Sequence, residues 1–337
     1  MSLLRRRALW LLLIPVLLLL MYVAGPKPAT PVYDTALPQL PAAATLLEAY
    51  IAEKEAQHQL RPNNQARIIW ANDRAKTATE YAIVYLHGFS ASQEEGNPVH
   101  TNLARKFGCN LYLARLAEHG IDTTEQLANL TAEKYWNSAK EAYAIGKQIG
   151  KKVILIGTST GGSNALQLAA TYPDVHALVL LSPNIEINNP NAWLLNNPWG
   201  LQIARLVTGS NYITPRDNRE IYKQYWNHPY RLEATVALQE YLETAITPAT
   251  FKKVSQPTLL LYYYRNEQEQ DAVVKVRAML RMFEQLATPA DKKRELAMPN
   301  TGDHVIGSYL KSNDYQGVEA EITKFMLDVL AMQLVQP

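Results

Sequence analysis

Short apolar segments alternate with amphipathic ones along most of the chain. The apolar segments predict seven strands, and several are continuous runs, which is typical of strands buried on both faces of a parallel sheet. The strands are expected at residues 66–71, 81–86, 110–114, 152–156, 177–181, 258–264 and 294–297. Helical patterns lie between them, at residues 99–107, 132–149, 161–171, 272–286 and 318–334. Because strands and helices alternate, the sequence predicts an α/β fold with a mainly parallel sheet flanked by helices.

Residues 184–250 interrupt this alternation. The segment has no strand pattern and is rich in Asn, Pro, Trp and Tyr, so we expect an inserted helical cap at about 184–250. Its aromatic side chains either line an apolar pocket or pack the cap on the core. These aromatic residues are Trp193, Trp199, Tyr212, Tyr222, Tyr225, Trp226, Tyr230 and Tyr241.

The chain begins with three arginines at residues 5–7, and an apolar run follows them. Between residues 8 and 24 only Pro15 is not apolar. The length of this run lies between that of a signal-peptide core and that of a membrane span. The sequence therefore favours a membrane anchor at residues 1–25, with a cleaved signal peptide as the alternative. The positive-inside rule keeps the arginines in the cytoplasm and places the rest of the chain outside it.

Residues 26–44 form a proline-rich segment after the apolar run. Repeated proline disfavours helix, so we expect an extended tether here. The α/β domain with its cap is then expected at residues 45–337. If the N-terminal segment is retained, this domain is held at the membrane; if it is cleaved, the protein is secreted or periplasmic.

Composition excludes several classes of protein. The chain has 337 residues, of which 47% are hydrophobic and 19% charged, as expected of a folded domain rather than a disordered one. The net charge is +2, so the chain after the three N-terminal arginines is slightly negative and nucleic acid is not an expected partner. Cys109 is the single cysteine, which rules out an intrachain disulfide. No metal-binding motif occurs, and we expect no metal.

The strongest chemical motif is Gly-Thr-Ser-Thr-Gly-Gly at residues 157–162, immediately after the strand expected at 152–156. A sharp turn from strand to helix needs small residues two before and two after the serine, and Gly157 and Gly161 are such residues. The turn would expose the hydroxyl of Ser159 at the N-terminus of the next helix. The motif predicts a nucleophilic serine; the alternative is a Gly/Ser/Thr loop or a phosphate-binding turn.

A second motif, His87-Gly88-Phe89, follows the strand expected at 81–86. Acyl transfer needs two donors directed at the developing oxyanion. One is the backbone N–H of the residue after the nucleophile, here Thr160, and the other is the backbone N–H of Phe89. A plain glycine turn after the strand is the alternative interpretation.

From about Tyr81 onward the chain resembles the α/β-hydrolase superfamily, most closely its carboxylesterase and monoacylglycerol-lipase-like branch. The resemblance rests on Leu86-His87-Gly88-Phe89, on Arg115-Leu116-Ala117-Glu118-His119-Gly120, on residues 157–162, on Asp271-Ala272-Val273-Val274 and on Gly302-Asp303-His304. It implies an α/β-hydrolase fold, no cofactor, and a catalytic triad in the order Ser, Asp, His. The residues in that order are Ser159, Asp271 and His304. Ala117 and Glu118 depart from the Pro and Gly of the family's R-L-P-G-H-G stretch.

His304 is the expected general base, because it follows the last predicted strand. The loop at residues 265–271 offers three carboxylates to orient it, namely Glu267, Glu269 and Asp271. The two glutamates lie in a wholly polar run, whereas Asp271 borders an apolar segment that should fix it. The sequence therefore favours Asp271.

Together these motifs predict a serine hydrolase that cleaves small-molecule or lipid-like carboxylic esters through an acyl-enzyme. A peptidase or amidase with the same triad is the first alternative. A binding protein of the cell envelope that keeps the fold without catalysis is the second.

Overall fold

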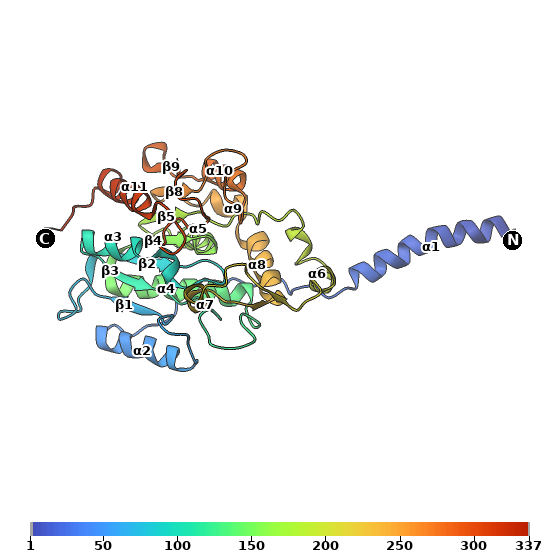
Figure 1. Cartoon of the computed structure of the whole chain (residues 1–337), viewed down its shortest axis with the longest axis horizontal. Coiled ribbons are helices and arrows are strands. Elements are labelled where there is room, and N and C mark those ends of the chain that lie inside the picture. Colours follow the sequence, from blue (N-terminus) through green and yellow to red (C-terminus); the bar gives the residue numbers. More distant parts are fainter. Residues whose placement is uncertain (1–2, 336–337) are drawn as a thin grey trace.

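A seven-stranded sheet lies at the centre of the molecule (Figure 1). The computed structural model describes the backbone of residues 3–335 and the side chains of residues 13–335. The strand order is β1-β3-β2-β4-β5-β8-β9; β1 is antiparallel to β3, and all other neighbours are parallel. The strands are β1 (Arg67–Ile69), β2 (Thr79–Leu86), β3 (Asn110–Leu113), β4 (Gly150–Thr158), β5 (Ala177–Leu181), β8 (Thr258–Tyr262) and β9 (Lys293–Ala297). Each lies at one of the seven positions predicted from the sequence, so the α/β class is confirmed.

Helices cover both faces of the sheet. Alternate residues of β2 explain why: Val84 packs into one apolar layer and Ile83 into the other, and both are fully buried. The first layer includes residues of α2 (Ala44–Ala56), α4 (Ala132–Ile149), α5 (Thr160–Thr171), α9 (Pro248–Phe251) and α10 (Val276–Gln285). The second includes residues of α3 (Val99–Phe107) and α11 (Tyr315–Asp328). Burial on both faces accounts for the continuous apolar runs in the central strands.

Two helices differ from their predicted bounds. The helix expected from residue 272 begins only at Val276, because the Asp271 side chain accepts the N–H groups of Val273 and Val274 and holds them in a turn. The helix expected to reach residue 334 ends at Asp328. Beyond it Ala331 adopts a positive φ of 52°, which the apolar pattern could not reveal.

The cap lies between β5 and β8. Its elements are η2 (Ala192–Leu194), α6 (Gly200–Thr208), β6 (Tyr212–Ile213), α7 (Glu220–Tyr225), β7 (Tyr230–Arg231) and α8 (Leu232–Ala245). β6 and β7 form a separate antiparallel pair, which the sequence did not predict. Each has two residues, too few to show a period-two pattern.

α1 (Leu3–Val23) projects away from the rest of the molecule, and its C-terminal end lies beside α6 (Figure 1). The indole N–H of Trp199 donates to the carbonyl of Met21 at 2.9 Å, and its backbone N–H donates to the carbonyl of Pro26 at 2.9 Å. Within residues 13–335, no helix is both long enough and apolar enough to cross a membrane. The side chains of the three N-terminal arginines lie outside the described residues.

The proline-rich segment after α1 runs along the domain. The carbonyl of Asp34 accepts the indole N–H of Trp136 at 2.7 Å, and its carboxylate pairs with Lys140 at 2.9 Å. Both partners belong to α4, so this part of the segment is held against the α4 layer.

Candidate active site

Ser159 occupies the turn between β4 and α5, with φ 53° and ψ −122°. A non-glycine residue with positive φ costs on the order of 1–3 kcal/mol, and it persists only where its surroundings hold it. Here the Ser159 N–H donates to the carbonyl of Leu181 at 2.9 Å, and the Ser159 carbonyl accepts the N–H of Asn184 at 2.9 Å. The last residue of β5 and the backbone just after it thus fix the strained turn that carries the hydroxyl.

The glycines around Ser159 allow a close backbone approach. A methyl group on Gly161 would overlap the carbonyl oxygen of Leu86, and one on Gly157 would overlap the carbonyl of Gly161. This contact brings the end of β2 against the start of α5. As a result the loop after β2 lies beside the serine: a methyl group on Gly88 would be 2.9 Å from the Cβ of Ser159.

His304 and Asp271 form a hydrogen-bonded pair. The imidazole Nδ1 of His304 lies 2.5 Å from Oδ2 of Asp271, whose residue is only 2% exposed. The other oxygen, Oδ1, accepts the N–H groups of Val273 and Val274 at 2.8 and 3.0 Å. Burial opposes the charged form of the imidazole, but the adjacent carboxylate prevails and raises the pKa of His304 above its usual value.

The two competing glutamates lie elsewhere. Glu267 accepts a hydrogen bond from the hydroxyl of Tyr264, and Glu269 pairs with Arg265 at 2.8 Å. Both are exposed at the tip of the loop, and neither has a hydrogen bond to His304. Of the three candidate carboxylates, the structure brings only Asp271 to the histidine.

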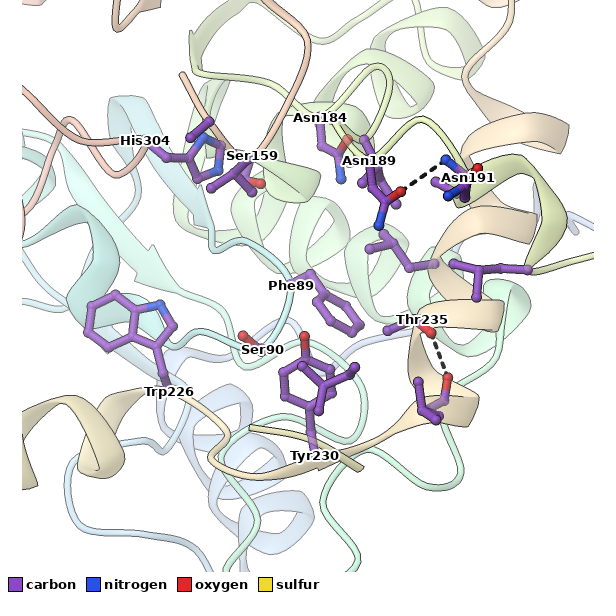
Figure 2. Close-up of a pocket in the computed structure, with 18 of the residues that line it drawn as sticks. Phe89, Ser90, Ser159, Asn184, Asn189, Asn191, Trp226, Tyr230, Thr235 and His304 are labelled. Atoms are coloured by element: carbon purple, nitrogen blue, oxygen red, sulfur yellow. Dashed lines mark hydrogen bonds between the residues drawn. The ribbon is translucent and has the colours of Figure 1, made fainter. Parts of the chain in front are cut away.

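Ser159 and His304 line the same cavity, with the imidazole next to the serine (Figure 2). Among the described residues no hydrogen bond joins the Ser159 hydroxyl to the ring. Catalytic hydrogen bonds often become short only when substrate is bound. The serine, the histidine and the aspartate come from the loops after β4, β9 and β8, which open at one edge of the sheet because these strands are parallel.

Buried histidines hold the loop after β2. Nδ1 of His87 donates to the carbonyl of Gly88 at 2.9 Å, and Nε2 accepts the N–H of Leu116 at 3.0 Å. Burial lowers the pKa of His87 to about 4, so the ring is neutral at pH 7 and can donate through one nitrogen and accept through the other. His119 accepts the N–H of Ser90 at 3.0 Å.

Phe89 lies in the chain between Gly88, which His87 holds, and Ser90, which His119 holds. Its backbone N–H has no hydrogen-bond acceptor among residues 13–335, and neither has that of Thr160, the first residue of α5. The two residues predicted to form the oxyanion hole thus flank Ser159 with unpaired donors. Such donors can bind a carbonyl oxygen that becomes negatively charged.

The loop that supplies His119 departs from the family motif without losing its turn. Glu118 takes the position of the family's glycine and adopts a positive φ of 66°. Gly120 follows with φ 69°. The side chain of His119 therefore still reaches the loop after β2.

The cavity has a volume of about 790 Å³. Its aliphatic side comes mainly from the cap and includes Ile187, Leu194, Leu195, Ile203, Val207, Ile213, Leu232 and Leu238. Polar groups near the serine and histidine are Glu95, Asn184, Asp303 and Lys311. Among the cap aromatics Tyr222, Trp226 and Tyr230 line the cavity, whereas Tyr225 and Tyr241 are buried by packing. Some of these aromatic residues therefore line the cavity, and others pack the cap on the core.

Sequence reasoning assigned no role to Glu95. This residue lies in the short 3-10 helix η1 (Gln93–Gly96), is buried, and accepts the N–H of Gly88. It stands in a polar stretch after the strand, Ser90 to Gly96, that resembles an ordinary solvated loop. Nothing in the pattern of residues marks it.

The chain belongs to the alpha/beta hydrolase family, because residues 83–313 match that family. A search among curated proteins found no match. One similar solved structure is that of one of the metagenome-derived lipolytic enzymes LipS and LipT, with a TM-score of 0.63 and 16% identity. Another is that of Est1E from Butyrivibrio proteoclasticus with bound ferulic acid, with a TM-score of 0.54 and 16% identity. The matches cover 80% of this chain and 99% of the first, and 79% of this chain and 95% of the second.

An esterase from Pyrococcus furiosus is also similar, with a TM-score of 0.51 and 15% identity over 81% of this chain and 89% of that one. At such identities the likeness establishes the fold. The mainly parallel sheet of this chain, with its flanking helices and inserted cap, is the α/β-hydrolase fold, as the motifs predicted.

Proposed function

We propose that the protein is a serine hydrolase of carboxylic esters, with Ser159 as nucleophile, His304 as base and Asp271 as the carboxylate that orients the base. The observation that carries this proposal is the His304–Asp271 pair at the same cavity as a serine held on a strained turn. The N–H groups of Phe89 and Thr160 would supply the oxyanion hole.

In the proposed reaction, Oγ of Ser159 attacks the carbonyl carbon of the ester while Nε2 of His304 takes its proton. The two backbone N–H groups stabilise the tetrahedral oxyanion. The alcohol leaves with the proton from His304 and an acyl-enzyme remains. Water, deprotonated by His304, then attacks the acyl carbon; the acid leaves and the serine regains its proton.

The cavity supports a small-molecule ester with an apolar acyl group as substrate. Aliphatic residues of the cap form one side, and a volume of about 790 Å³ is large enough for a medium-sized lipid-like molecule. The similarity in fold to a lipolytic enzyme and to an esterase is in keeping with such a substrate.

A fluorophosphonate probe tests the nucleophile. Wild type should be labelled, and Ser159→Ala should not be. Ser163→Ala is the matched control, since its hydroxyl lies on α5 but donates to the carbonyl of Asn184; this variant should still be labelled. Labelling of Ser159→Ala at the wild-type rate would exclude the mechanism, and an unlabelled wild type would favour a binding protein. Comparing esters with anilides of one acyl group separates an esterase from an amidase.

We further propose that residues 1–25 anchor the enzyme in a membrane, with the catalytic domain outside the cytoplasm. Apolar side chains at residues 13–23 are exposed, and the end of α1 adjoins α6 through Trp199. On α6, Leu206 and Val207 are 84% and 80% exposed. A bilayer around α1 would lie close to this apolar part of the cap. The alternative, cleavage of the segment, would give a secreted or periplasmic enzyme.

A further inference from the structure

Glu95 is a buried carboxyl group that the proposed reaction does not use. It is 2% exposed and lines the cavity together with Ser159 and His304. It comes from η1, which follows the loop after β2. A buried carboxyl group in a catalytic cavity is costly unless it is neutral or has a specific partner, so its presence calls for a functional reason.

The partner of Glu95 is the loop that carries the oxyanion donor. Oε2 accepts the N–H of Gly88 at 2.5 Å, while Oε1 has no hydrogen-bond partner among the described residues. A methyl group on Gly88 would be 2.8 Å from Oε1 and 2.9 Å from the Cβ of Ser159. The carboxyl group of Glu95 and the side chain of Ser159 therefore both lie close to the Cα of Gly88.

Gly88 is held on both sides. Glu95 binds its N–H, and His87 binds its carbonyl, which belongs to the same peptide group as the N–H of Phe89. The orientation of that peptide decides where the N–H of Phe89 points. The bond to Glu95 holds the preceding His87–Gly88 peptide. Removing this bond would loosen Gly88 on that side, while the Gly88 carbonyl would keep its contacts with His87 and with the N–H of Ala91 at 3.3 Å.

The surroundings favour the protonated form of Glu95. Burial raises the pKa of its carboxyl group to about 8, against the opposing effects of the Gly88 N–H and of His304, and Asp303 raises it further. At pH 7 the group is mainly neutral. The other titratable or charged groups near it are Tyr85 of β2, Tyr135 of α4, Tyr222 of α7, and Lys311, which pairs with Asp303.

We propose that Glu95, as an uncharged carboxylic acid, is a positioning residue for the oxyanion hole, and that loss of its proton slows acyl transfer. This inference rests on the proposed ester hydrolysis. The neutral acid accepts the Gly88 N–H without adding charge. A carboxylate at the same place would put a negative charge one residue away from the donor that must stabilise an oxyanion, and two like charges at such short range repel.

The pH dependence of kcat tests the inference. With a 4-nitrophenyl ester between about pH 6 and 10, wild type should lose activity above about pH 8. Glu95→Gln keeps an acceptor for the Gly88 N–H and cannot ionise, so the alkaline decrease should disappear. The matched control is Glu94→Gln: Glu94 is also buried in η1, but it accepts from Asn97 at 2.8 Å and does not bind Gly88. The kcat of this control should decrease at alkaline pH as that of wild type does.

A second variant tests positioning. Glu95→Leu removes the acceptor, so kcat at pH 7 should fall on the order of 10²-fold with little change in KM, since one oxyanion donor is misplaced. Glu95→Gln should restore the activity. Wild-type kcat in Glu95→Leu would overturn the positioning role. If the leucine variant does not fold by circular dichroism, the pH profile of Glu95→Gln decides alone.

The outcomes separate the two proposals. If wild type shows no turnover that depends on Ser159, the proposed function is wrong and the inference falls with it. If turnover depends on Ser159 but Glu95→Gln keeps the alkaline decrease of wild type, only the role of Glu95 is wrong.

Discussion

Nδ1 of His304 lies 2.5 Å from Oδ2 of Asp271, although the two residues come from loops after different strands. β8 and β9 are parallel neighbours, so their C-terminal ends meet at one edge of the sheet and their loops can touch. Asp271 is fixed further by the N–H groups of Val273 and Val274. The carboxylate that is hydrogen-bonded to the histidine is thus held by its own turn, away from the exposed tip of the loop.

Replacing Asp271 by Asn should lower kcat by about 10³- to 10⁴-fold, because an amide neither stabilises the imidazolium nor maintains the required tautomer. Initial rates on a 4-nitrophenyl ester measure the effect. Glu269→Gln is the matched control, since this exposed glutamate pairs with Arg265 and should leave the rate close to wild type. Near-normal turnover in Asp271→Asn, with a large loss in Glu267→Gln or Glu269→Gln, would transfer the role to a glutamate.

The activity should rise with pH through the pKa of His304. The base works only when neutral, and although burial opposes its charged form, the Asp271 carboxylate raises the pKa of the ring above its usual value of about 6.5. In Asp271→Asn burial remains and the carboxylate is gone, so the midpoint of the rise should move to lower pH. Profiles of kcat/KM for wild type and for the residual activity of the variant check this. An unchanged midpoint would contradict the coupling.

The sheet and the turn that carries Ser159 could be predicted because they leave local signals. Strands such as β5 are continuous apolar runs, and Ser159 lies in a glycine-bounded turn whose spacing is dictated by sterics. Asp271 and His304 were found through the order of family motifs. Their contact spans 33 residues and depends on neighbouring parallel strands, which local patterns do not specify.

The contacts that hold the loop after β2 could be predicted only in part. His87 stands beside Gly88 in the motif that marks this turn. Glu95 has no such signal, because its importance comes from burial that the cap and the core create around it. The two-residue strands β6 and β7 were missed for a similar reason, since they depend on pairing between distant segments.

Acid should destabilise the fold through its buried histidines. Burial lowers the pKa values of His87 and His100 to about 4, whereas the unfolded value is about 6.5. Between these values the unfolded chain binds protons that the folded chain does not. The stabilisation is therefore complete above about pH 6.5 and is lost as the pH falls towards 4, by about 3 kcal/mol per histidine.

Urea unfolding at several pH values measures this loss. His100→Gln should reduce the slope of the unfolding free energy against pH, because one buried imidazole is gone. His58→Gln is the control, since His58 is exposed on the surface. An equal slope in His100→Gln and wild type would show that His100 is not buried in its neutral form.

The N-terminus of the protein recovered from expressing cells should be intact, and the protein should fractionate with membranes. Eleven of the 17 residues at 8–24 are Leu, Ile or Val, worth on the order of −4 kcal/mol of insertion free energy in total. Detergent should release the protein and about 1 M salt should not, because insertion is apolar rather than electrostatic. A variant with Leu206→Ser and Val207→Ser should stay bound, since α1 is the anchor. Mass spectrometry that finds a mature start between Pro26 and Thr30 would instead show a cleaved signal peptide and a secreted or periplasmic enzyme.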